Sequence, residues 1–223
     1  MITVVDVETS WQVTNTGGYD PSPYHPDNIL VSVGINDEYY FTNHSERIDK
    51  GCYHNIQSIL DKTTLLVGHN IKFDLMWLLE AGFKYTGRVY DTMLGEYILN
   101  RGIRKSLTLE MSCRRRRIGS KDSRIKEFTD RGIPFQNIPV NLVEEYGRMD
   151  VQITRDLFNS QMADFRMPKN KHLLMTAKMM NEFLIVLSDM EANGININLE
   201  ELSKVEKEYR AEFAYLKQKI DKI

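Results

Sequence analysis

The chain has 223 residues, of which 42% are hydrophobic and 27% charged, a composition typical of one folded domain with an appendage. No apolar run approaches the roughly 20 residues that a membrane span needs, and the N-terminus lacks the basic and apolar regions of a signal peptide. The two cysteines, Cys52 and Cys113, exclude a disulfide framework and a cysteine-rich zinc site and favour a reducing compartment.

The net charge of −2 hides an asymmetry along the chain. Residues 101–131 contain eleven Lys or Arg against four Asp or Glu, a net charge of +7, so the rest of the chain carries −9. A basic segment on an otherwise acidic protein indicates a contact with a polyanion, with a solvated loop as the alternative.

The first half of the chain predicts three consecutive strands followed by alternating helices and strands. The expected strands are Ile2–Glu8, Ile29–Ile35, Glu38–Thr42, Thr64–Val67 and Arg88–Tyr90, and the expected helices are Cys52–Leu60, Asp74–Ala81 and Thr92–Leu99. Residues 10–28 contain Gly17-Gly18 and three prolines, which predict a long loop. This order of elements predicts an α/β fold with a mixed sheet flanked by helices.

The second half is expected to be helical. A helix is predicted over Lys105–Arg117, and Asn141 with Glu144 has the capping-box spacing of a helix that ends before Pro168. A strongly apolar helix follows over Leu173–Met190. We therefore expect one domain over residues 1–165 and a C-terminal helical extension over residues 166–223.

The last predicted helix starts at Asn198, which has Glu201 three residues later. One stripe of this helix is apolar, formed by Leu202, Val205, Tyr209, Phe213, Leu216 and Ile220. An apolar stripe needs a partner, so it either packs on the first domain or binds a further module.

Asp6 and Glu8 are two residues apart on the first predicted strand, so both side chains point to the same face of the sheet. Closely paired carboxylates suit Mg²⁺ or Mn²⁺ better than zinc, which prefers nitrogen and sulfur ligands. The Asp-x-Glu pattern alone is common, and its position at the end of a buried strand gives it weight.

Asn70-Ile71-Lys72-Phe73-Asp74 lies where a predicted strand turns into a helix, and ligands bind outside the carboxyl ends of such strands. The alternative for Asp74 is a favourable interaction with the helix N-terminus. His69, which has no second His at ligand spacing, is expected to orient the loop.

Tyr146 and Asp150 are four residues apart and share one face of a predicted helix. Tyr146 also falls on the apolar stripe, so it can be a core aromatic. A carboxylate on that same face must be paired, bind a metal or reach water.

Taken in chain order, three short motifs resemble the Exo I, Exo II and Exo III motifs of the DEDD superfamily of 3′–5′ exonucleases. They are Asp6 with Glu8, the segment 70–74, and Tyr146 with Asp150. Tyr146 four residues before Asp150, with Glu145 where another subtype has His, resembles the tyrosine subtype. The segments 67–74 and 90–94 are similar to the proofreading domain of family A DNA polymerases, and residues 20–34 are similar to phage members. The resemblance covers about residues 1–165 and implies a ribonuclease H-like fold and a cytoplasmic location in a bacterium or a phage-infected host cell.

The resemblance also implies a role for each acidic residue. Asp6, Glu8 and Asp150 would hold the first of two Mg²⁺ or Mn²⁺ ions, and Asp6 would bridge to a second ion that Asp74 supports directly or through water. Tyr146 and Glu8 would orient the attacking water. The nearby Asp91 lies outside this set and is expected to be structural.

Substrate binding is predicted from residue type. Stacking on the bases of a single strand is expected for Trp11 and Phe73, with a core position as the alternative for Phe73, and Asn70 is also placed at the substrate. Contacts with the phosphate backbone are expected for five basic residues, Arg101, Arg104, Lys105, Arg114 and Arg115. The run of four Arg at residues 114–117 departs from the family pattern and has a solvated helix end as its alternative.

Residues 182–195 resemble the segment in which these polymerases leave the exonuclease domain, and the remaining chain has no room for a polymerase palm. We therefore expect a fragment or one half of a split polymerase, with single-stranded DNA 3′ ends as substrate and a polymerase module, in the same or a separate chain, as partner. We expect no polymerase activity in this chain. The alternatives are an RNA-trimming exonuclease of the same superfamily and a catalytically silent module that binds nucleic acid or docks a polymerase.

Overall fold

A computed structural model describes residues 1–119 and 124–221. Its strands are β1 (Ile2–Thr9), β2 (Gln12–Val13), β3 (Tyr19–Asp20), β4 (Leu30–Ile35), β5 (Glu38–Phe41), β6 (Leu65–Gly68) and β7 (Arg88–Asp91). Its helices are α1 (Cys52–Leu60), α2 (Ile71–Glu80), α3 (Thr92–Leu99), α4 (Leu109–Arg116), α5 (Arg124–Thr129), the 3₁₀ turn η1 (Phe135–Asn137), α6 (Val140–Arg166), α7 (Leu173–Asn193) and α8 (Leu199–Ile220). The chain divides into two compact units, Met1–Ala192 and Asn193–Ile223.

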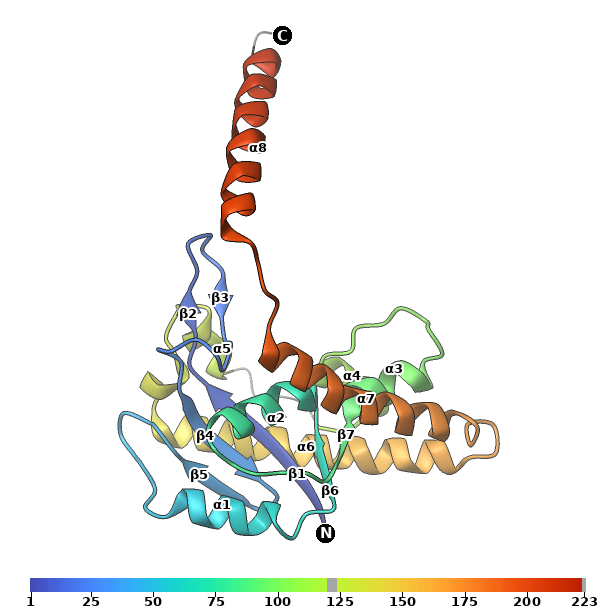
Figure 1. The fold of residues 1–223 in the computed structure, drawn as a ribbon. Helices are drawn as coiled ribbons and strands as arrows, with labels where there is room; N and C mark the ends of the chain where they lie inside the picture. Colours follow the sequence, from blue (N-terminus) through green and yellow to red (C-terminus); the bar gives the residue numbers. More distant parts are fainter. Residues whose placement is uncertain (120–123, 222–223) are drawn as a thin grey trace. The chain divides into compact units, whose positions relative to one another are not determined.

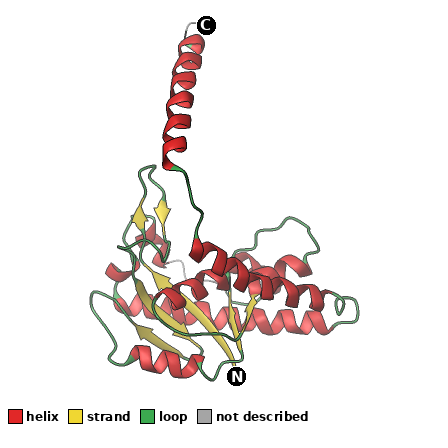
Figure 2. Cartoon of the chain, viewed as in Figure 1, coloured by secondary structure: helices red, strands yellow, loops and turns green. Residues whose placement is uncertain are grey.

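The first unit is built on a five-stranded mixed sheet with the strand order β5-β4-β1-β6-β7 (Figure 1). β1 lies at the centre, antiparallel to β4 and parallel to β6. The β4–β5 hairpin turns at Asn36-Asp37, where Asn36 has the left-handed φ of 53° that Asn tolerates. This is the mixed sheet that the order of predicted elements indicated, and helices cover both of its faces (Figure 2).

Alternating side chains of the central strand are buried in two different hydrophobic cores, one on each face of the sheet. Val5 and Val7 pack with α1 and α2, whereas Val4 packs on the opposite face with α6. Because side chains alternate along a strand, Asp6 and Glu8 share the face of Val4 and therefore point toward α6. The long helix α6 runs along this face and contacts β1, β4 and β6.

Several predicted boundaries differ in the structure. The helix predicted from Lys105 starts only at Leu109, because Thr108 caps it by accepting a hydrogen bond from the Met111 amide. Asn141 does not cap α6: that helix begins at Val140, and Pro139 stands at the cap position, where its carbonyl accepts a hydrogen bond from the Val143 amide at 3.2 Å. The predicted long loop over residues 10–28 contains the short antiparallel pair β2–β3.

Helix α7 belongs to the first compact unit, which ends after Ala192, whereas the sequence placed a boundary after residue 165. Leu184 and Ala177 of α7 are buried in the cores on the two sides of the sheet. The second unit contains α8, which starts at Asn198 as predicted, with the Asn198 side chain accepting from the amides of Glu200 and Glu201.

Candidate active site

The structure brings three of the predicted carboxylates together at the end of β1. One oxygen each from Asp6, Glu8 and Asp150 lie within 4.8 Å of one another, and within the described residues this is the group that has the geometry to hold a metal ion. Asp6 is half-buried, and Glu8 and Asp150 are buried. Asp6 and Glu8 come from one face of β1, and Asp150 faces them from α6.

The close approach of α6 to the sheet depends on two glycines. Gly34 pairs with Asp6 across the β1–β4 ladder, and a Cβ atom at Gly34 would stand 2.8 Å from Cγ2 of Val151. Gly147 of α6 lies against the ring of Tyr39 from β5, where a Cβ atom would stand 2.8 Å from Cζ. The missing side chains let α6 lie close enough for Asp150 to meet the strand carboxylates.

The fourth carboxylate, Asp74, reaches the site from the first turn of α2. Its Oδ1 accepts a hydrogen bond of 3.0 Å from the amide of Val7, which lies beyond the last β1–β6 pair at Val4 and Val67. Asp74 is buried, and burial together with the charge of Asp6 raises its pKa well above the usual value. Asp74 and Asp6 therefore lie close enough for their charges to interact.

Tyr146 lies one helical turn before Asp150 on the buried face of α6. Its hydroxyl hydrogen-bonds the Asp150 side chain, and burial, Glu8 and Asp150 raise the pKa of the phenol. Tyr146 therefore remains a neutral hydrogen-bond donor at physiological pH. The phenol therefore lies beside the carboxylates as a donor.

The oxygen donors of this site fit divalent Mg²⁺ or Mn²⁺. The set consists of carboxylates, which are the ligands preferred by hard cations, and it contains neither the thiolates nor the imidazoles that characterise zinc sites. Asp6, Glu8 and Asp150 present one common position for an ion, and Asp74 lies next to Asp6 to extend the set.

Tyr39 and Ser32, which no sequence pattern indicated, also belong to this region. Ser32 pairs with Glu8 across the ladder, and its Oγ lies 2.8 Å from the Tyr39 hydroxyl, which also donates to the carbonyl of Val143 at 3.3 Å. These contacts tie β4 and β5 to the start of α6. The register of β4 against β1 places Ser32 opposite Glu8, and the packing of α6 brings the Val143 carbonyl to Tyr39.

His69 orients the loop before α2, in agreement with its expected role. Its two ring nitrogens lie 2.9 Å from the hydroxyl of Thr92 and 2.9 Å from the carbonyl oxygen of Leu107. Asp91, expected to be structural, caps α3 by accepting from the Met93 amide at 2.8 Å.

The predicted stacking residues lie in different environments. Trp11 is half-buried and packs edge-on against Tyr19 at 5.6 Å and Phe135 at 5.9 Å between ring centroids. Phe135 in turn lies 6.1 Å from Tyr146, so aromatic rings connect Trp11 to the carboxylate site. Phe73 packs against the α1–α2 core, and Asn70 is exposed with a left-handed backbone.

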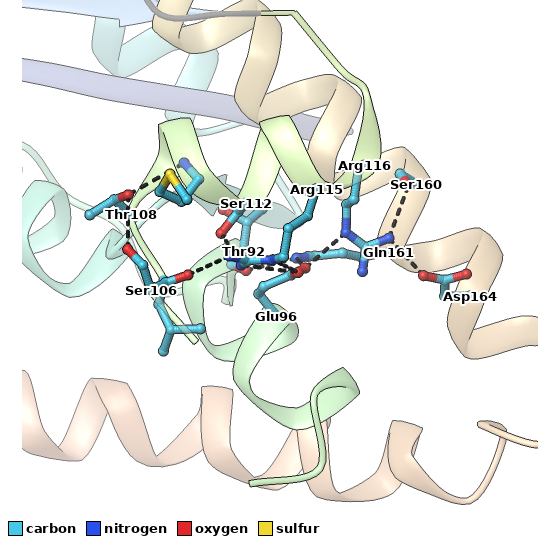
Figure 3. A network of polar contacts seen from close by, with 12 residues as sticks. Thr92, Glu96, Ser106, Thr108, Ser112, Arg115, Arg116, Ser160, Gln161 and Asp164 are labelled. Atoms are coloured by element: carbon cyan, nitrogen blue, oxygen red, sulfur yellow. Dashed lines mark hydrogen bonds and ion pairs between the residues drawn. The ribbon is translucent and has the colours of Figure 1, made fainter. Parts of the chain in front are cut away.

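Two of the predicted phosphate-binding residues have intramolecular partners. Arg115 forms an ion pair with the buried carboxylate of Glu96 at 3.3 Å, together with its neighbour Arg116 at 2.8 Å (Figure 3). Arg101 donates to the carbonyl of Lys169 and to Oδ1 of Asn170. The remaining three predicted residues are exposed: Arg104, Lys105 and Arg114.

The arginine run at residues 114–117 thus has a mixed structural role. Arg116 lies between Glu96 of α3 and Asp164 of α6, and Gln161 completes the network by donating to Glu96. The network shown in Figure 3 fastens α4 to α3 and α6. Arg114 is exposed one position before the two arginines that hold the helix in place.

Comparisons with known proteins assign the family. A model of 3′–5′ exonucleases matches residues 14–163, a segment that contains Asp74, Tyr146 and Asp150. The chain belongs to this 3′–5′ exonuclease family. Asp6 and Glu8 precede the matched segment, and the structure brings them to the residues within it.

The curated relatives of this exonuclease are much longer proteins. DNA polymerase I of Borreliella burgdorferi is 26% identical over 145 residues, which cover 65% of this chain and 15% of the polymerase. DNA polymerase I of Chloroflexus aurantiacus is 27% identical over 155 residues, covering 68% of this chain and 16% of that protein. The matched segment therefore spans about a sixth of the length of these polymerases.

Solved structures share the fold of this exonuclease. NrnC of Brucella melitensis bound to pGG has a TM-score of 0.62 and 19% identity, covering 86% of this chain and 85% of NrnC. NrnC with bound Mg²⁺ gives the same TM-score at 17% identity, with 86% of each chain covered. The catalytic core of RRP6 from Trypanosoma brucei has a TM-score of 0.53 and 11% identity, covering 82% of this chain and 45% of that one. These likenesses confirm the ribonuclease H-like fold class.

In the part of the chain that is described, no helix has the length and hydropathy to cross a membrane.

Proposed function

We propose that this exonuclease removes nucleotides from the 3′ end of DNA with two Mg²⁺ or Mn²⁺ ions and proofreads for a DNA polymerase. The observation that carries the proposal is the meeting of Asp6, Glu8 and Asp150 within 4.8 Å, with Asp74 beside them. Bound divalent ions at such a site stabilise the attacking and leaving oxygens of a phosphodiester displacement.

The chain supplies binding and orientation. Asp6, Glu8 and Asp150 would hold the first ion, and Asp6 with Asp74 the second. Tyr146, which stays protonated, would orient the attacking water as in the tyrosine subtype, together with Glu8. The exposed Arg104, Lys105 and Arg114 would follow the phosphate backbone, and Trp11 would stack on a terminal base.

DNA is the favoured substrate because the curated relatives that match this chain are DNA polymerases. A second candidate is a short RNA or oligonucleotide substrate, which the likeness to NrnC bound to pGG favours. Discrimination between these polymers rests on contacts with the 2′-hydroxyl, so matched DNA and RNA substrates separate the two candidates.

A polymerase module is the proposed partner, in the same or a separate chain. The segments that match this chain are only 15% and 16% of the two DNA polymerases, so most of each polymerase lies outside the match. Within the second unit, α8 buries none of its side chains, and its apolar stripe is exposed, with Tyr209 at 68% and Phe213 at 70%. Such a stripe is suited to packing against another protein surface.

The test is degradation of 5′-labelled single-stranded DNA, and of RNA of the same sequence, with Mg²⁺, Mn²⁺ or EDTA. Asp6→Ala and Asp150→Ala should each lower the rate by on the order of a thousandfold, about 4 kcal/mol of transition-state stabilisation. Asp61→Ala, at an exposed position at the end of α1, is the matched control and should leave the rate unchanged. A folded protein that cleaves neither polymer with any metal would instead favour a silent docking module.

A further inference from the structure

Helix α2 carries Asp74 in its first turn, yet the helix lacks a side-chain cap of its own. Asn70 stands at the cap position with φ 64° and ψ 43°, and its side chain accepts no hydrogen bond from the helix. The first amides of a helix need acceptors when they are not exposed to water. The placement of Asp74 therefore depends on groups from elsewhere in the fold.

Asp91, at the end of β7, supplies the missing acceptor. Its Oδ1 accepts from the Asn70 amide at 2.9 Å and from the Met93 amide at 2.8 Å, and the Ile71 and Leu94 amides also interact with this carboxylate. One side chain, 1% exposed, thus serves the N-termini of both α2 and α3.

Asp91 is itself held by α7. The backbone amide of Asp91 donates to Oδ1 of Asn181 at 2.6 Å, and Nδ2 of Asn181 donates to the carbonyl of Ala177 at 2.7 Å. Asn181 is 3% exposed, so this amide group is fixed by two buried hydrogen bonds. The chain of contacts Asn181–Asp91–Asn70, here called the clamp, joins α7 to the start of α2.

A second contact reinforces the same connection. Lys72, in the first turn of α2 and two residues before Asp74, forms an ion pair with Glu191 of α7. Leu184 of α7 also packs in the core that contains Ile71 and Leu75. Helix α7 therefore fixes the first turn of α2 through polar and apolar contacts.

We propose that Asn181 and Asp91 are positioning residues of the exonuclease, which set the distance of Asp74 from Asp6 by fixing the start of α2. This inference rests on the proposed metal site. It makes α7 part of the catalytic unit, although α7 lies outside the segment 14–163 that the family model matches. Neither residue belongs to the group of carboxylates that would hold the ion.

The test measures two quantities for the full chain and for each variant. The first is the Mn²⁺ affinity, from calorimetry, and the second is the Mg²⁺ concentration that gives half-maximal cleavage. Outer-shell partners of metal ligands are worth about 10–100-fold in affinity, and the clamp acts one step further out. We expect Asn181→Ala to weaken Mn²⁺ binding about three- to tenfold and Asp91→Ala about tenfold or more. The Mg²⁺ requirement should shift by the same factors, with a smaller change in rate at saturating metal.

Two variants distinguish positioning from a general loss of structure. Asp91→Asn keeps an oxygen that can accept from the Asn70 and Met93 amides, so its Mn²⁺ affinity should stay within about threefold of wild type. Ser188→Ala removes a buried hydroxyl from the same helix and should bind Mn²⁺ like wild type. If Asp91→Ala does not fold, the comparison of Asn181→Ala with Ser188→Ala decides.

Three results would overturn the proposal in distinguishable ways. Wild-type affinity in Asn181→Ala, with binding abolished in Asp6→Ala, would leave the metal site standing and remove the clamp. Equal losses in Asp91→Asn and Asp91→Ala would show that Asp91 acts by its charge. Absence of Mn²⁺ binding to the wild-type protein would remove the proposed metal site and the clamp with it.

Discussion

Replacement of Gly147 by Ala should destabilise the protein, although the same change stabilises most helices. Gly is about 1 kcal/mol less favourable than Ala in a helix interior, so propensity alone predicts a gain of that size. The new methyl group would stand 2.5 Å from the Tyr39 hydroxyl oxygen and 2.8 Å from Cζ of that ring. The tertiary packing therefore opposes the local preference.

The ring of Tyr39 cannot yield without breaking other interactions. It is 4% exposed, and its hydroxyl bonds Ser32 at 2.8 Å and the Val143 carbonyl at 3.3 Å. Overpacking costs about 1–3 kcal/mol, and the removal of a buried hydrogen bond about 1–3 kcal/mol more. With the propensity gain subtracted, the expected net destabilisation is about 1–5 kcal/mol.

Urea denaturation with metal-free protein measures this effect, and a Tyr39→Leu background is the matched control because it removes the ring atoms that the methyl group meets. In that background Gly147→Ala should stabilise the protein by up to about 1 kcal/mol. Cleavage should fall by up to about a hundredfold in the single variant, because a shift of α6 displaces Tyr146 and Asp150. A stabilised single variant with normal activity would refute the dependence of the site on a close approach of α6.

Two further predictions concern charged groups. Arg116→Ala should lower the free energy of unfolding by about 2–3 kcal/mol, because it removes a partner from buried Glu96 and breaks the ion pair with Asp164. Replacement of the exposed Arg114 by Ala should change the free energy of unfolding by less than about 0.5 kcal/mol, and it should reduce the salt slope of single-strand binding by about 0.7 for each phosphate that this side chain neutralises. Equal stability effects of the two variants in urea denaturation would contradict the network of Figure 3. Because the pKa of Asp74 is raised, the folded, metal-free protein binds the proton of the Asp74 carboxyl more tightly than the unfolded chain does. The contribution of Asp74 to the free energy of unfolding should therefore fall as the pH rises from the unfolded pKa, near 3.8, through the raised folded pKa. Asp74→Asn, which keeps an acceptor for the Val7 amide, should stabilise the metal-free protein at neutral pH and flatten this dependence in pH-resolved melting curves, and an unchanged slope would show that Asp74 is not the group responsible.

The sequence by itself determined the local geometry of the site. The two-residue repeat of a strand puts Asp6 and Glu8 on one face, and the 3.6-residue repeat of a helix puts Tyr146 and Asp150 on another. The hydrophobic runs indicated the order of strands and helices, and the cap at Asn198 was recognisable because it depends on residues within three positions. These features follow from short-range sterics and hydrogen bonding.

Contacts between distant residues required the tertiary structure. Arg115 and Arg114 are neighbours of the same type, and only the position of Glu96 on α3 makes one structural and leaves the other exposed. Asn141 matched a capping pattern, but Pro139 started the helix earlier. Asp91 and Asn181 are 90 residues apart, so no local pattern relates them. The physical reason is that burial and packing select which of several locally allowed contacts form, and that selection depends on the whole fold.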